Sequence, residues 1–105
     1  MNEKLFEQVK RKLNITWEDD DTNARLKEII ESAIPTLIHK LGISDPNFDF
    51  NIAGQENNLF KSYCLYEWNH ATNEFDDNYS NEIAQIQRKH EVLNYQNNEV
   101  SEDEE

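Results

Sequence analysis

Glycine and proline are scarce in this sequence, and each occurs only twice in 105 residues. A β-sandwich or β-barrel needs frequent turn residues, so this scarcity argues against both architectures. The hydrophobic share is 36%, which is low for a globular domain, and a chain of this length forms one small core. We therefore predict an all-α domain that resembles a small four-helix bundle.

Cysteine occurs once, as Cys64, so the chain can form no internal disulfide and a reducing compartment is expected. Residues 1–13 lack the apolar core of a signal peptide, and no apolar run approaches the length of a membrane span. These absences predict a protein that is made in the cytoplasm and has no membrane partner.

Basic residues are outnumbered, since 10 Lys and Arg stand against 22 Asp and Glu, for a net charge of −12. This balance disfavours binding to nucleic acid and to anionic membranes. It fits solubility, a basic protein partner, or a channel wall that DNA passes without binding. Residues 96–105 hold five of the acids and no base. We expect this acidic tail to be separate from a helical domain over 1–95, and disordered unless a partner orders it.

Apolar residues at helical spacing predict a first helix over residues 2–13 that ends at Asn14. Ile15 and Trp17 are expected to fold back on the core. A second helix should begin at Asp21 or Thr22 as the N-cap.

The second helix is expected to end before Gly42, which occupies a typical C′ position. Pro35 removes a backbone hydrogen bond, so a kink or two successive helices are predicted there. An irregular loop follows over about 42–55. Its Phe48 and Phe50 either form an arm on a neighbouring surface or tuck beneath their own domain.

A third helix is predicted over about 56–75, with apolar and aromatic residues around half of its circumference. Such a helix should be central and contact several neighbours. A fourth helix carries a narrow apolar seam of Tyr79, Ile83, Ile86, His90 and Leu93. The predicted core consists of Leu26, Ile30, Ile34, Leu37, Phe60, Tyr63 and Trp68.

Residues with catalytic or metal-binding chemistry form no known motif. Cys64 and His70 fall on different stripes of the third helix, and the chain has no CxxC, HxxxH or HExxH. We expect no enzyme activity, no metal and no cofactor. Glu67 lies between the aromatic stripes, so it should reach solvent or pair with His70 or with an arginine such as Arg25 or Arg88.

A family resemblance runs from residue 4 to about 95, where a short first helix is followed by four elements. They are the acidic linker "ITWEDDDTNARL", the helix "LKEIIESAIPTLIHKLG", the aromatic helix "NLFKSYCLYEWNHATNEF" and the last helix "NEIAQIQRKHEVLNY". This order resembles the head–tail connector (adaptor) proteins of tailed bacteriophages. The best-matching residues are Leu26, Ile29, Ile30, Tyr63, Leu65, Trp68 and Asn69, together with the "IQRKHEV" segment. Pro35 departs from the family's usual uninterrupted second helix.

The resemblance implies a subunit of a ring, typically twelvefold, beneath the portal protein in the virion neck. Such a ring continues the DNA channel, through which the genome passes without specific binding, and docks a head-completion (stopper) or tail protein. The C-terminal segment would engage the portal, which gives a predicted portal interface of Arg88, Lys89, His90, Val92, Leu93, Tyr95 and Val100. The predicted subunit–subunit interface consists of Arg25, Phe48, Phe50 and Glu67. Acids would face the lumen, and the acidic tail would reach a basic portal surface.

Two alternative functions fit parts of the same sequence. An acidic inhibitor that mimics DNA would explain the net charge. A small helical regulatory protein would pair through the seam of the fourth helix and form discrete dimers.

Overall fold

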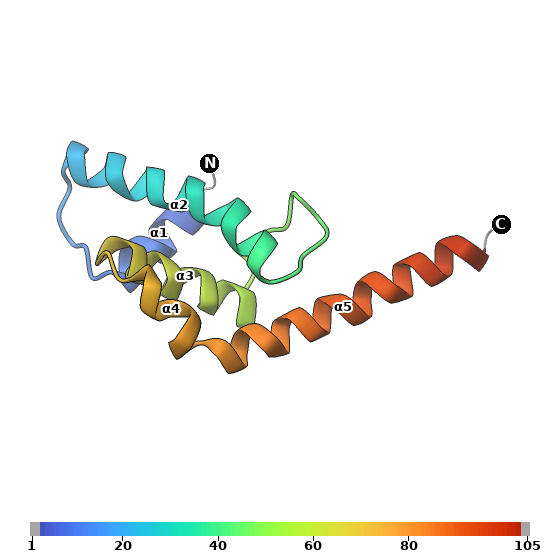
Figure 1. The fold of residues 1–105 in the computed structure, drawn as a ribbon. Helices are drawn as coiled ribbons and strands as arrows, with labels where there is room; N and C mark the ends of the chain where they lie inside the picture. Colours follow the sequence, from blue (N-terminus) through green and yellow to red (C-terminus); the bar gives the residue numbers. More distant parts are fainter. Residues whose placement is uncertain (1–2, 104–105) are drawn as a thin grey trace.

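The computed structural model describes the backbone of residues 3–103 and the side chains of residues 3–95. This part of the chain contains helices and no strand, which confirms the all-α prediction. The elements are α1 (Glu3–Lys12), α2 (Asp20–Lys40), α3 (Gln55–Trp68), α4 (Thr72–Asn78) and α5 (Ser80–Asp103). Helix α3 contacts all four others and lies between α1 and α5 (Figure 1). The expected central position of the aromatic helix is therefore confirmed.

Helix α2 begins at an N-cap two or three residues earlier than predicted. The cap is Asp19, whose backbone is extended and whose Oδ2 accepts hydrogen bonds from Thr22 N at 3.0 Å and Thr22 Oγ1 at 2.9 Å. Each acid from Asp19 to Asp21 is a good capping residue. Only Asp19 has a threonine three residues later that donates to it twice, so it forms the cap.

Pro35 lies inside α2, which continues from Asp20 to Lys40, so the predicted division into two helices is wrong. Pro35 is exposed, whereas Ala33 and Leu37 on either side of it are fully buried. The missing N–H thus falls on the solvent side, where water can bind the carbonyl that it leaves free. The buried side keeps the helix in register through its packing.

Three helices end in the same way, with one residue in the left-handed conformation after the last turn. These residues are Asn14 (φ 59°), Gly42 (φ 69°) and His70 (φ 58°). After each of them, the next N–H donates to a carbonyl five residues back, at 2.8–3.1 Å. This is the Schellman arrangement. The predicted ends at Asn14 and Gly42 are confirmed.

The end at His70 was not predicted. The single helix expected over 56–75 is in fact two helices, α3 and α4, separated by Asn69–Ala71. The left-handed conformation is uncommon for residues other than glycine, although histidine adopts it more readily than most. No glycine marks the break in the sequence, which explains why the prediction was wrong.

The loop between α2 and α3 folds beneath its own domain. Phe50 is 2% exposed and stacks on Phe60 with ring centroids 4.7 Å apart, and Phe48 meets Phe50 edge-on at 5.0 Å. The buried Asn57 amide donates to Phe50 O at 2.6 Å and to Gln8 Oε1 at 2.7 Å. These contacts fix the loop from both sides, so of the two alternatives the loop tucks beneath its own domain. The predicted place of Phe48 and Phe50 at a subunit interface is corrected.

The core lies between α3 and the helices around it. Of the predicted core residues, Leu26, Ile30, Leu37 and Phe60 are fully buried, and Ile34, Tyr63 and Trp68 are half-buried against them. Ile15 is buried as expected. Trp17 is 51% exposed and its indole donates to Thr22 Oγ1 at 3.3 Å, so its predicted place in the core is wrong.

Candidate docking surfaces

The first turns of α5 are anchored on the body of the domain. Ile83 and Ile86 are buried, and they are the centre of the predicted seam. Gln87 Nε2 donates to Lys40 O at 2.8 Å, and Asn94 Nδ2 donates to Gly42 O at 3.4 Å. As far as His90, the seam of α5 is therefore used within the subunit, where it fixes the direction in which the helix leaves the body. Leu93, the last residue of the predicted seam, stays exposed.

Glu56, at the start of α3, forms a charged cluster with α5. Its Oε2 accepts from His90 Nε2 at 2.9 Å and forms an ion pair with Lys89 Nζ. Burial alone would raise the pKa of Glu56, but hydrogen bonds from Lys89, its own backbone and His90 outweigh burial and lower that pKa. The cluster therefore holds an ionised carboxylate at a half-buried junction between α3 and α5.

His90 was predicted to contact a portal, and this assignment is corrected. Its side chain is buried between Glu56 and the edge of Phe48, whose ring centroid lies 5.8 Å from that of the imidazole. The hydrogen bond from His90 to Glu56 and the packing of the imidazole against Phe48 hold the loop, α3 and α5 together. A residue in this position offers no surface to a partner.

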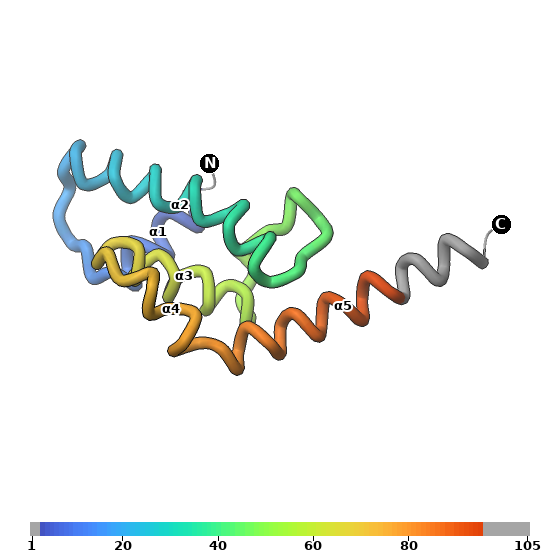
Figure 2. Tube along the Cα trace, in the orientation of Figure 1, coloured from blue at the N-terminus to red at the C-terminus, as the bar shows by residue number. Residues whose placement is uncertain are grey.

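Helix α5 extends away from the body of the domain (Figure 2). Beyond this cluster it exposes apolar side chains to solvent. Val92 is 51% exposed, Leu93 44% and Tyr95 68%. Val92 and Leu93 line a shallow groove together with Gln85, Arg88 and Lys89. We call Arg88, Val92, Leu93 and Tyr95 the α5 strip. Val100, also predicted to contact the portal, lies outside the described side chains.

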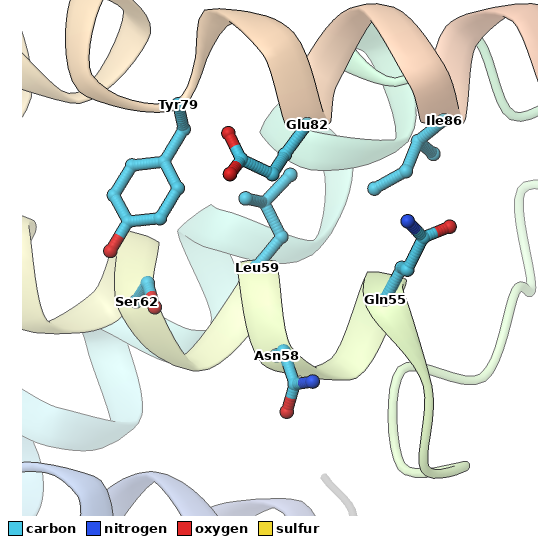
Figure 3. Close-up of a pocket in the computed structure, with 7 residues that line it drawn as sticks. All are labelled: Gln55, Asn58, Leu59, Ser62, Tyr79, Glu82 and Ile86. Atoms are coloured by element: carbon cyan, nitrogen blue, oxygen red, sulfur yellow. The ribbon is translucent and has the colours of Figure 1, made fainter.

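A second groove lies between α3 and the start of α5 (Figure 3). It is open, has a volume of about 150 Å³, and is lined by Gln55, Asn58, Leu59, Ser62, Tyr79, Glu82 and Ile86. Glu82 is the one carboxylate among these residues, and no His, Cys or basic residue is present. The groove offers amide and hydroxyl groups around an apolar floor but brings no acid–base pair together.

Arg25, predicted at a subunit interface, caps α3 within its own chain. Its Nη2 donates to Trp68 O at 2.6 Å and lies 3.3 Å from His70 Nε2, and its guanidinium lies 4.1 Å from the centroid of the Trp68 ring. The positive charge sits at the negative end of the α3 dipole. The proposed pairing of Arg25 with Glu67 is therefore corrected.

Glu67 lies half-buried one turn after Tyr63 and interacts with its hydroxyl. Burial first, and then the Glu67 carboxylate, raises the pKa of Tyr63. The same two causes raise the pKa of the buried Cys64 thiol far above its usual range. A thiol held protonated in this way is a poor nucleophile and a poor metal ligand.

A cluster of basic residues was missed in the sequence because its members come from two helices. Arg11 and Lys12 in the last turn of α1 and Lys61 in the middle of α3 line one depression with Gln8. We call these four residues the basic groove. The sequence separates Lys61 from Arg11 by fifty positions, so only the packing of α1 on α3 brings them together.

Among the described residues, no group of three or more His, Cys, Asp and Glu side chains is placed to hold a metal ion. No helix in the described part of the chain is both long and apolar enough to cross a bilayer. Comparisons with protein-family models, with curated proteins and with solved structures found no match to this chain.

Proposed function

We propose that this protein is a head–tail connector subunit of a tailed bacteriophage, which forms a ring beneath the portal and docks tail-side proteins. The observation that carries the proposal is the α5 strip. Its three apolar side chains are the main exposed apolar group on α5 up to residue 95, where the described side chains end, and the inner face of the helix is anchored on the body. A rigid helix with an exposed apolar side is a common way to enter a groove on a partner protein.

The anchoring of α5 supports a docking role over pairing between two small regulators. Of the five residues expected to form a dimer seam, Ile83, Ile86 and His90 are buried within the subunit, Tyr79 is half-buried, and Leu93 stays exposed. What remains exposed is the α5 strip, which carries the positive charge of Arg88 beside Val92 and Leu93. A strip of this composition suits a portal surface with an apolar pocket and an acidic rim.

The net charge of −12 supports a position around passing DNA. The excess negative charge of a ring of such subunits repels the phosphate backbone. The genome can then move through the ring without being held by it.

Mixing the protein with its cognate portal oligomer tests this proposal by electron microscopy of the complexes. The expected result is a ring of extra density on the tail-facing side of the portal. Val92→Asp should abolish this density because it places a charge in the apolar contact. Ile52→Asp is the matched control, because Ile52 is 69% exposed in the loop and lies outside the α5 strip. Undecorated portals with the unmodified protein, or equal decoration by both variants, would refute the proposal.

A further inference from the structure

Some basic residues of this acidic chain have a described partner, and others do not. Those with a described partner are Lys10 with Glu18, Lys40 with Asp76, Lys89 with Glu56, and Arg25 with the Trp68 carbonyl. Arg11, Lys12 and Lys61 are paired with no acid among the described residues. Three unpaired cations thus share one depression, the basic groove.

The floor of the basic groove is held in place by hydrogen bonds. Gln8 Nε2 donates to Asn51 Oδ1 at 3.1 Å, while Gln8 Oε1 accepts from Asn57 Nδ2 at 2.7 Å. Both ends of the Gln8 amide are therefore occupied, and α1 is tied to the loop and to α3. The backbone that carries the cations is therefore fixed, so a ligand has to order only their side chains.

The same chain contains a segment with the complementary charge. The acidic tail, residues 96–105, holds five acids and no base. Residues 96–103 of this tail belong to α5 itself, and α5 leaves the body on the side of α3 opposite to α1 (Figures 1 and 3). The groove is lined by α1 and α3, on the far side of the body from α5. We therefore take the tail of a second copy, and not the chain's own tail, as its occupant.

We propose that the acidic tail of one copy binds in the basic groove of a second copy. Each subunit then gives a tail to one neighbour and accepts a tail from the other. Such a contact is heterologous, so it generates a ring when the rotation between copies closes. The proposal stands whether or not the ring docks on a portal, because both halves of the contact lie in this chain.

The first test measures self-association of the full chain by sedimentation velocity over a range of protein concentrations. Concentration-dependent association is expected at low ionic strength, and it should disappear near 1 M salt, where the screening length is about 3 Å. Lys61→Glu should weaken association about tenfold, because it replaces an attraction by a repulsion. Lys27→Glu is the matched control, because Lys27 is exposed on α2 and lies outside the groove.

A second test uses a synthetic peptide of residues 96–105 as the probe. The peptide is titrated into a full chain whose own tail has lost its charge. In this variant the five acids are replaced by amides: Glu99→Gln, Glu102→Gln, Asp103→Asn, Glu104→Gln and Glu105→Gln. In NMR spectra, the acidic peptide should shift the amide signals of Gln8, Arg11 and Lys61. The same peptide with amides in place of its acids should not. Lys12→Glu provides a second groove variant if Lys61→Glu lowers the melting temperature of the protein.

Three outcomes would overturn the proposal. They are a chain that stays monomeric at every concentration, association that Lys61→Glu and Lys27→Glu weaken equally, and a peptide that shifts other residues. If the tail of each chain fills the groove of that same chain, the protein stays monomeric, which is the first of these outcomes. The portal experiment is independent of these results, because Val92→Asp leaves both the groove and the tail unchanged.

Discussion

Replacing Arg25 with alanine should destabilise the isolated subunit by about 2–3 kcal/mol. A hydrogen bond from a charged donor contributes about 1.5–3 kcal/mol, and Arg25 Nη2 makes one to Trp68 O at 2.6 Å. The stacking of the guanidinium on the Trp68 ring, at 4.1 Å, adds about 0.5–1 kcal/mol. Arg25 is half-buried, so we take the lower part of the combined range. For a domain of this size, the expected fall in melting temperature is about 10–15 °C.

Urea unfolding followed by far-UV circular dichroism measures this loss. Arg25→Lys should cost less, because it keeps a charge near the end of α3 but cannot stack as a plane or donate in a fixed geometry. Lys27→Ala, on the exposed side of the same helix, should change the free energy of unfolding by no more than about 0.5 kcal/mol. An Arg25→Ala chain as stable as the unmodified protein would refute the assignment of Arg25 as a cap. It would favour the subunit interface predicted from the sequence.

Two further predictions concern the ionisable groups around α3. Because the pKa of Glu56 is lowered on folding, its stabilisation is complete above the ordinary glutamate pKa of about 4.3 and is lost as the pH falls through the lower folded-state value. Glu56→Gln should therefore flatten the acid limb of a plot of unfolding free energy against pH, and an unchanged limb would contradict the cluster. Because burial keeps Cys64 protonated, iodoacetamide should label it at pH 8 only as fast as the chain opens, whereas rapid labelling of the folded protein would show an accessible thiolate.

The parts of the fold that follow from local chemistry were predictable from the sequence. The apolar spacing of α1 and α2 and the residues Asn14 and Gly42 act within one or two turns of where they lie, so helix ends can be read from them. The predicted N-cap of α2 was wrong by two or three residues because three successive aspartates have nearly equal capping propensity. The choice among them depends on Thr22, whose hydroxyl and N–H both bond to Asp19.

The break between α3 and α4 depends on contacts far apart in the sequence. His70 takes a left-handed conformation that costs about 1–2 kcal/mol for a residue with a Cβ atom. Arg25 helps to offset this cost, because it binds the last carbonyl of α3 and lies beside the His70 ring. Since 45 positions separate Arg25 from His70, no local pattern marks the break.

The docking residues show the same division between local and distant causes. Val92 and Tyr95 lie outside the predicted seam of α5, so the spacing of apolar residues indicates their exposure, whereas Leu93 belongs to that seam and is nevertheless 44% exposed. The burial of Phe50 and His90 could not be read from spacing. Each is enclosed by a contact between distant segments, Phe50 on Phe60 and His90 on Glu56.

The two proposed contacts should respond to salt in opposite ways. Each copy carries a net charge of −12, so copies repel one another, and added salt weakens this repulsion. Salt also weakens the attraction between the acidic tail and the basic groove, whereas it leaves burial of the α5 strip intact or strengthens it. A ring held by the groove alone would therefore dissociate in strong salt. A ring that is also seated through the α5 strip would remain on its portal, because the apolar contact lasts after the charges are screened. Salt concentration thus separates the role of the groove from that of the strip.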